Sequence, residues 1–135
     1  MSTHNIPRTA LQLRSLVKQS GELEVSLASV PVPEPATNEV LVRIEASPIN
    51  PSDLGLLFGA ADMNTVKASG SAEQPVVTAR IPEGAMKAMA GRLDAPMPVG
   101  NEGAGLVVAA GSSRSGRPPR AGRSGRESSR PNQST

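Results

Sequence analysis

The clearest alternation of hydrophobic and polar residues lies at residues 40–46, whose sequence is VLVRIEA. Aliphatic side chains occupy every even position, whereas Arg43 and Glu45 fall on odd ones. Side chains two residues apart share one face of an extended chain, so one face of this segment is apolar. The pattern predicts a half-buried β-strand.

Two further extended runs precede this strand. Residues 9–18 (TALQLRSLVK) and residues 22–30 (ELEVSLASV) flank a Gln-Ser-Gly segment that is typical of a turn. Together they predict a β-hairpin. Three prolines within residues 31–39 each remove a backbone hydrogen-bond donor, so this stretch is expected to form an exposed connector.

The stretch NPSDLGLLFG at residues 50–59 predicts a short helix. Asn50 or Ser52 supplies an N-cap, and Pro51 suits the first turn. Gly59 is expected to end the helix. Three apolar residues recur within it at helical spacing, namely Leu54, Leu57 and Phe58.

Residues 60–98 form a variable region without a continuous period, and they are rich in alanine, serine, glycine and proline. The run PVVTARI within it is apolar, and Pro82 is expected to begin a second short helix. The side chains expected on one side of that helix are Met86, Met89, Ala90 and Leu93. A last strand, LVVAA, is expected to start near Gly105.

No valine, leucine, isoleucine, methionine or phenylalanine occurs after Gly111. Residues 112–135 contain six arginines and one glutamate, net +5, whereas the preceding 111 residues carry net −3. A segment without apolar residues cannot offset its ordering entropy, so residues 112–135 are expected to be disordered, as are residues 1–8. GC-rich DNA translated in a shifted frame from about codon 112 would also yield this composition, and the nucleotide sequence would test that hypothesis.

The composition excludes several classes of site. The chain contains no cysteine and one histidine, His4, so disulfides, thiolate metal sites and a Ser-His-Asp triad are excluded. No apolar run approaches the roughly 20 residues that cross a bilayer, which favours a cytoplasmic location without membrane contact. Residues 1–21 are basic and lack acidic residues, which leaves a mitochondrial presequence as the alternative.

The glycines of GNEGAGLVV invite a dinucleotide-binding interpretation. That fingerprint requires a strand before the glycines and a helix after them, and here a strand-like run follows Gly105. The alternative is a purely structural role, in which the glycines lead into a closely packed strand. Asp53 and Glu102 could in principle act as a pair of carboxylates in acid–base chemistry, but no sequence feature fixes the distance between them.

Two motifs carry a resemblance to a known family. VLVRIEASPINPSD at residues 40–53, followed by PVGNEGAGLVVAAGS at residues 98–112, resembles the N-terminal GroES-like domain of the medium-chain dehydrogenase/reductase superfamily. The nearest likeness is to its zinc-free quinone oxidoreductases and trans-2-enoyl thioester reductases. The resemblance covers residues 9–111. It implies a mainly β (α+β) fold, an incomplete GroES-like barrel with one or two short helices and a disordered C-terminal tail.

The resemblance also assigns site residues. Zinc-containing relatives place ligands where this chain has Asn50 and Asn101, so no metal site is expected. Asn50 is the candidate contact to the nicotinamide ribose of NADP(H). Ser52, Asp53, Asn101 and Glu102 are expected to line the cleft. The enoyl thioester reductases carry a catalytic tyrosine where this chain has Ala61, so the catalytic residues remain unassigned.

The resemblance therefore implies a truncated, substrate-side domain of an NAD(P)H-dependent oxidoreductase. It is expected to be inactive alone, because the superfamily binds the cofactor through a second, Rossmann domain. A small-molecule substrate is implied, and exposed strand edges favour self-association. The alternatives are a non-enzymatic binding module and non-specific nucleic-acid binding by the arginine-rich tail, which has no aromatic residue for base stacking.

Overall fold

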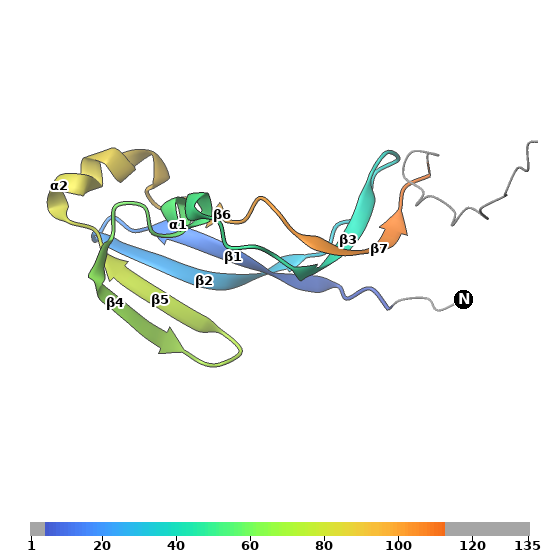
Figure 1. Ribbon diagram of the computed structural model, residues 1–135, viewed down its shortest axis with the longest axis horizontal. Helices are drawn as coiled ribbons and strands as arrows, with labels where there is room; N and C mark the ends of the chain where they lie inside the picture. Colours follow the sequence, from blue (N-terminus) through green and yellow to red (C-terminus); the bar gives the residue numbers. More distant parts are fainter. Residues whose placement is uncertain (1–4, 113–135) are drawn as a thin grey trace, which may run out of the picture.

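Strands are the main secondary-structure elements of the fold (Figure 1). The computed structural model describes residues 5–112. The predictions for residues 1–4 and for the basic tail at residues 113–135 concern parts of the chain outside this range. The elements in chain order are β1 (Thr9–Val17), β2 (Glu22–Pro31), β3 (Val40–Ala46), α1 (Pro51–Phe58), β4 (Asp62–Gly70), β5 (Pro75–Arg80), α2 (Glu83–Met86), the 3-10 helix η1 (Lys87–Arg92), β6 (Met97–Pro98) and β7 (Ala104–Ala110).

The predicted hairpin of β1 and β2 forms the centre of the larger sheet. The two strands pair antiparallel from Thr9 opposite Pro31 to Val17 opposite Leu23. The sheet has the order β4-β5-β2-β1-β6, and β3 pairs with β7 in a separate two-stranded ribbon. Neither sheet closes on itself, so the predicted mainly β, incomplete barrel is confirmed.

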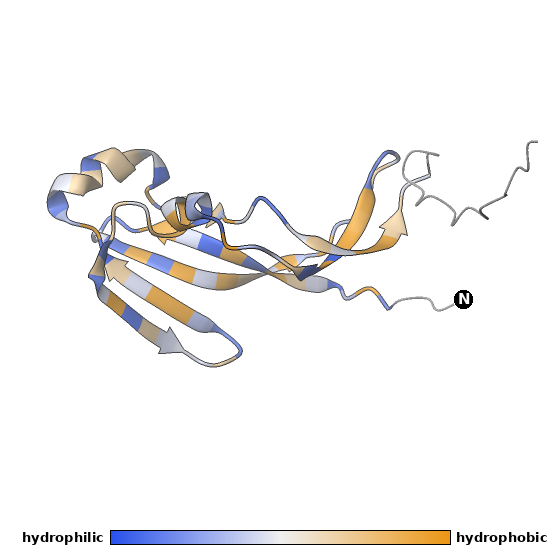
Figure 2. Cartoon of the chain, viewed as in Figure 1, coloured by the Kyte–Doolittle hydropathy of each residue, from blue (hydrophilic) through white to orange (hydrophobic). Residues whose placement is uncertain are grey.

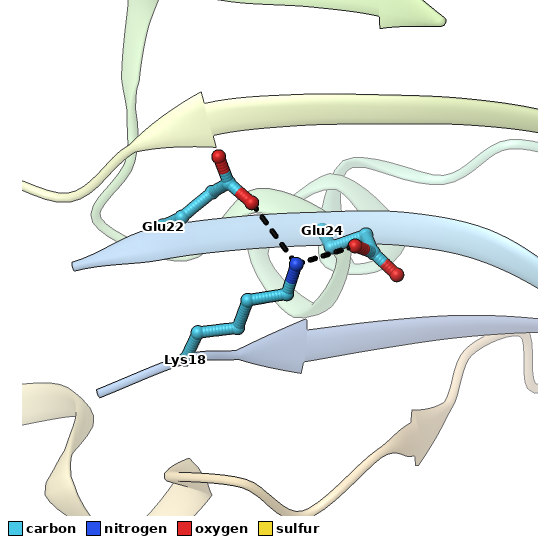
Figure 3. A network of polar contacts seen from close by, with 3 residues as sticks. All are labelled: Lys18, Glu22 and Glu24. Atoms are coloured by element: carbon cyan, nitrogen blue, oxygen red, sulfur yellow. Dashed lines mark hydrogen bonds and ion pairs between the residues drawn. The ribbon is translucent and has the colours of Figure 1, made fainter. Parts of the chain in front are cut away.

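Polar contacts hold the turn of this hairpin (Figure 3). Lys18 Nζ lies 3.0 Å from Glu22 Oε1 and 2.6 Å from Glu24 Oε2. These hydrogen bonds to two carboxylates raise the pKa of Lys18 above its ordinary value. At the other end of the hairpin, the Val32 backbone N–H donates to the Arg8 carbonyl over 2.9 Å. Arg8, within the start that was expected to be disordered, is therefore held next to the end of β2.

A small aliphatic core lies between the closed end of the hairpin and the helices. Its buried members are Val17, Leu23, Val25, Ile81 and Met89. Leu57 and Phe58 of α1 pack against it, whereas Leu54 is 50% exposed. The predicted helix is confirmed, but Leu54 lies off the face of α1 that packs on the core, where Leu57 and Phe58 are less exposed.

The variable region adds a second hairpin to the sheet edge. β4 and β5 pair antiparallel, and β5 continues the pairing onto β2. The predicted second helix is confirmed as α2 continued by η1. Met86 and Leu93 pack on the core beside buried Met89, as expected, whereas Ala90 is exposed.

The ribbon of β3 and β7 extends away from this core (Figure 1). Val40 pairs with Ala110, Val42 with Val107 and Ile44 with Gly105, and the register shifts between Leu41 and Val42 and again after Ile44. A Cβ atom at Gly105 would overlap the Arg43 carbonyl oxygen. Glycine is therefore required there by close backbone packing, which agrees with the structural interpretation of the glycine-rich motif.

Candidate functional site

The candidate site is built on the first turn of α1. Asn50 is the N-cap, with extended backbone angles of φ −93° and ψ 156°, and Pro51 follows it. The Asn50 N–H donates to Asp53 Oδ2 over 2.9 Å, and the Asp53 N–H donates to the Asn50 carbonyl over 2.9 Å. These two bonds fix the conformation of the NPSD motif and hold the Asn50 side chain at the end of the helix.

The two sequence motifs meet at Asn50 and Glu102. Asn50 Nδ2 lies 3.4 Å from Glu102 Oε2, although the residues are 52 positions apart in the chain. Asn50 is half-buried and Glu102 is exposed. An amide donor and a carboxylate are thereby presented side by side at the N-terminus of a helix, where the helix dipole is positive.

Asp53 does not share in this exposed pair. Its side chain is buried, at 6% exposure, and Oδ2 is already engaged by the Asn50 N–H. Its Oδ1 atom is buried without a hydrogen-bond partner among the described residues. The position of Asp53 therefore suits it to shaping the turn that carries Asn50.

The other residues named from the sequence differ in their exposure. Ser52 is exposed in the first turn of α1, and Asn101 is exposed beside Glu102 in the loop that leads to β7. Ala61 is half-buried and packs against the core, and its N–H donates to the Phe58 carbonyl over 2.9 Å.

Sequence reasoning did not identify the contacts that hold the other end of α1. Arg92 Nη2 donates to the Leu56 carbonyl over 2.8 Å and to Ser15 Oγ over 2.9 Å. Ser15 is fully buried, and its hydroxyl donates to the Leu57 carbonyl over 2.6 Å. Burial lowers the pKa of Arg92. A cation at the C-terminus of a helix interacts favourably with the dipole, so this contact fixes the position of α1 and with it Asn50.

An apolar groove of about 390 Å³ lies elsewhere, between the open end of the hairpin and the ribbon. Its lining includes Leu11, Val30, Leu41 and Val108, and it includes no residue of α1. Within residues 5–112 no group of three His, Cys, Asp or Glu side chains is placed to hold a metal ion. None of the helices in the same range is long and apolar enough to span a membrane.

Comparison with known proteins gives one informative similarity. No protein-family model matches the chain. Over 43 residues the chain is 54% identical to a zinc-type alcohol dehydrogenase-like protein of Schizosaccharomyces pombe. The similarity is to an oxidoreductase-like protein. The matched stretch is 31% of this chain and 13% of that relative, and it supports the resemblance to the medium-chain dehydrogenase/reductase superfamily at the level of a fragment.

Proposed function

We propose that residues 9–111 form the substrate-side part of an NAD(P)H-dependent oxidoreductase related to the quinone and enoyl thioester reductases. The observation that carries this proposal is the contact of Asn50 with Glu102, 3.4 Å between Nδ2 and Oε2. It unites the two motifs on which the resemblance rests. The similarity to an alcohol dehydrogenase-like protein supports the same superfamily.

In this proposal Asn50 faces the nicotinamide ribose. Its backbone is fixed by Asp53, so the carboxamide is held in place before a ligand arrives, which lowers the entropic cost of binding. The neighbouring Glu102 carboxylate orients the amide by accepting from Nδ2. Ser52 and Asn101, which are close in sequence to Asn50 and Glu102, supply further exposed polar groups. The nicotinamide, when bound, supplies the hydride.

The donor chemistry supports a site without zinc. The side chains that stand at the two ligand positions of zinc-containing relatives are the carboxamides of Asn50 and Asn101. Zinc in proteins prefers thiolate, imidazole and carboxylate ligands, and a carboxamide is a poor substitute. The Asn50 amide is also engaged with Glu102.

We further propose that turnover requires a nucleotide-binding domain. The glycines of the second motif lead into β7, and Gly105 packs directly on β3. A pyrophosphate site requires the glycines to open a helix, whose N-terminus then meets the phosphates. The described residues therefore contribute contacts to the nicotinamide side of a cofactor but no such phosphate site.

Nuclear magnetic resonance tests the role of Asn50. Saturation transfer from the chain to reduced nicotinamide mononucleotide at about 5 mM, a concentration suited to weak binding, should reach the nicotinamide and its ribose. Asn50→Ser keeps an N-cap residue and should remove this transfer, because serine cannot reach the ribose. No transfer in the wild-type chain would refute the proposed site.

The matched control is Asn64→Ser, an identical change at an exposed asparagine of β4. It should leave the transfer unchanged. Calorimetric titration of NADPH tests the second part of the proposal: the chain should show no micromolar binding on its own, and a micromolar dissociation constant would contradict the need for a nucleotide-binding domain.

A further inference from the structure

The outer edge of β7 is an unprotected strand edge. β7 has the sequence AGLVVAA, with no charged residue and no proline. It pairs with β3 on one side, and within residues 5–112 no strand pairs with its other side. An edge strand of this kind presents backbone N–H and C=O groups to any chain that can add a strand.

Several large apolar side chains of the ribbon are exposed as well. Leu106 and Val107 of β7 are 50% and 44% exposed. Across the ladder, Val42 and Ile44 of β3 are 37% and 55% exposed. Figure 2 shows β3 as one of the most hydrophobic stretches of the chain. The ribbon thus combines free hydrogen-bonding groups with aliphatic surface that pairing would remove from water.

Two of the other outer strands, β3 and β4, carry charges that discourage such pairing, and the third, β6, is only two residues long and includes Pro98. β3 presents Arg43 and Glu45, which are half-exposed and bonded to each other over 2.8 Å. β4 contains Asp62 and Lys67. Charged side chains at an edge oppose the approach of another strand, because they would lose hydration. β7 is therefore the edge at which strand addition is least opposed.

We propose that a second copy of this chain pairs its β7 with this β7 in an antiparallel, two-fold symmetric arrangement. The product is a four-stranded sheet in which the two β7 strands lie at the centre and the two β3 strands at the outside. With the two-fold axis at Val107, that residue faces its own copy, and Leu106 faces Val108 of the second copy. Cross-strand aliphatic pairs of this kind stabilise antiparallel sheets.

The charge of the following residues favours the antiparallel direction over the parallel one. Residues 112–135 carry net +5 and begin two positions after β7 ends. In an antiparallel pair the two segments leave from opposite ends of a seven-residue strand, about 24 Å apart at 3.4 Å per residue. This exceeds the Debye length of about 8 Å at physiological ionic strength. Parallel stacking would instead place like charges together.

The interface is small, so the association is expected to be reversible. One strand pair with its side chains falls at the low end of interface sizes, where weak and transient associations are found. Sedimentation velocity of the full chain from about 1 to about 100 µM tests the proposal, with refractive-index detection because the chain contains no tryptophan or tyrosine. The expected result is a shift from 13.9 kDa to twice that mass.

A charge-reversal pair identifies the contact. Val107→Lys and Val107→Glu should each prevent dimer formation, because the symmetric register places two like charges face to face. An equimolar mixture should restore it, since lysine then faces glutamate. Val42→Lys is the matched control: it places the same charge on the ladder partner of Val107 in β3, and it should leave the dimer intact.

Circular dichroism of each variant establishes that the strands are retained. A wild-type chain that stays at the monomer mass throughout the concentration range would overturn the proposal. Equal loss of the dimer in Val42→Lys and Val107→Lys would also overturn it, as would failure of the mixture to recover a dimer. Assembly directly into large particles without a dimer would show that the pairing is not closed by two-fold symmetry.

Discussion

Ser15 is fully buried in β1, and its hydroxyl connects two parts of the fold. It donates to the Leu57 carbonyl over 2.6 Å and accepts from Arg92 over 2.9 Å. Replacement by alanine leaves a carbonyl and a guanidinium N–H without this partner in a buried setting. A buried polar group without a partner costs about 1–3 kcal/mol.

We therefore expect Ser15→Ala to lower the free energy of unfolding by about 1–3 kcal/mol, measured by urea denaturation followed by circular dichroism. Ser52→Ala removes the same hydroxyl from an exposed position on α1 and should change the stability by less than about 0.5 kcal/mol. Equal effects of the two substitutions would contradict a structural role for the Ser15 hydroxyl.

Lys18 makes the stability of the hairpin turn dependent on pH. Its bonds to Glu24 and Glu22 raise its pKa above the ordinary value of 10.5. The contribution is therefore complete below that value and is lost as the pH rises through the higher pKa of the folded state. The side chain is 35% exposed, so solvent screening limits the contribution to about 0.5 kcal/mol.

The expected result is a melting temperature of the wild-type chain slightly above that of Lys18→Met at neutral pH. The difference should disappear in strongly alkaline buffer, where Lys18 is uncharged. Added salt at neutral pH should reduce it as well, because exposed ion pairs are screened. A difference that persists at alkaline pH would assign the effect to packing of the lysine stem instead.

Local signals predicted some site residues and missed others for a physical reason. The capping role of Asn50 follows from its place before Pro51, because a helix N-terminus is determined within a few residues. The contact of Arg92 with Ser15 joins residues 77 positions apart. The sequence around either residue does not predict that contact, because only the tertiary fold brings the two residues together.

At the scale of elements, alanine substitution is expected to have opposite effects on stability at two glycines with different surroundings. A Cβ atom at Gly105 would overlap the Arg43 carbonyl oxygen, whereas nothing lies within 4 Å of one at Gly55 in α1. Gly105→Ala should therefore separate β7 from β3 and destabilise the chain by about 2 kcal/mol or more. Gly55→Ala should stabilise α1 by about 0.5–1 kcal/mol.

Hydrogen exchange of the backbone amides distinguishes these effects by location. Gly105→Ala should speed exchange in β3 and β7 and leave the β1–β2 hairpin protected. Gly55→Ala should slow exchange in α1. Unchanged protection of the ribbon in Gly105→Ala would show that the backbone tolerates the added methyl group.

Elements with a regular period were predictable, and the edge hairpin was not. β1, β2 and β3 alternate apolar and polar residues, and α1 has a proline in its first turn and a glycine after its end. β4 is mostly exposed and pairs with β5 alone, so burial imposes little pattern on its sequence. Its extended conformation depends on contacts with β5, such as the hydrogen bond that the Arg80 N–H donates to Thr65 Oγ1 over 2.7 Å.

At the scale of the whole molecule, the core is small for the surface that it must support. Within residues 5–112 six hydrophobic side chains are buried, and twelve large ones are exposed by 37% or more. Burial of apolar surface is the main favourable contribution to folding. The monomer is therefore expected to have marginal stability.

Thermal denaturation followed by far-ultraviolet circular dichroism measures this directly. The expected result is a broad transition whose midpoint rises with protein concentration, because association stabilises the folded chain by mass action. A sharp transition of a monomer, independent of concentration, would contradict both the marginal stability and the coupling to association.

The turn between β4 and β5 offers a position for a spectroscopic label. Residues 71–74 close that hairpin away from α1 and from the ribbon (Figure 1), and Glu73 within them is exposed. The sequence contains no cysteine, tryptophan or tyrosine. Glu73→Cys would therefore supply a unique thiol for a fluorophore against a dark background, and each binding or assembly event could be observed without disturbing the strands that take part in it.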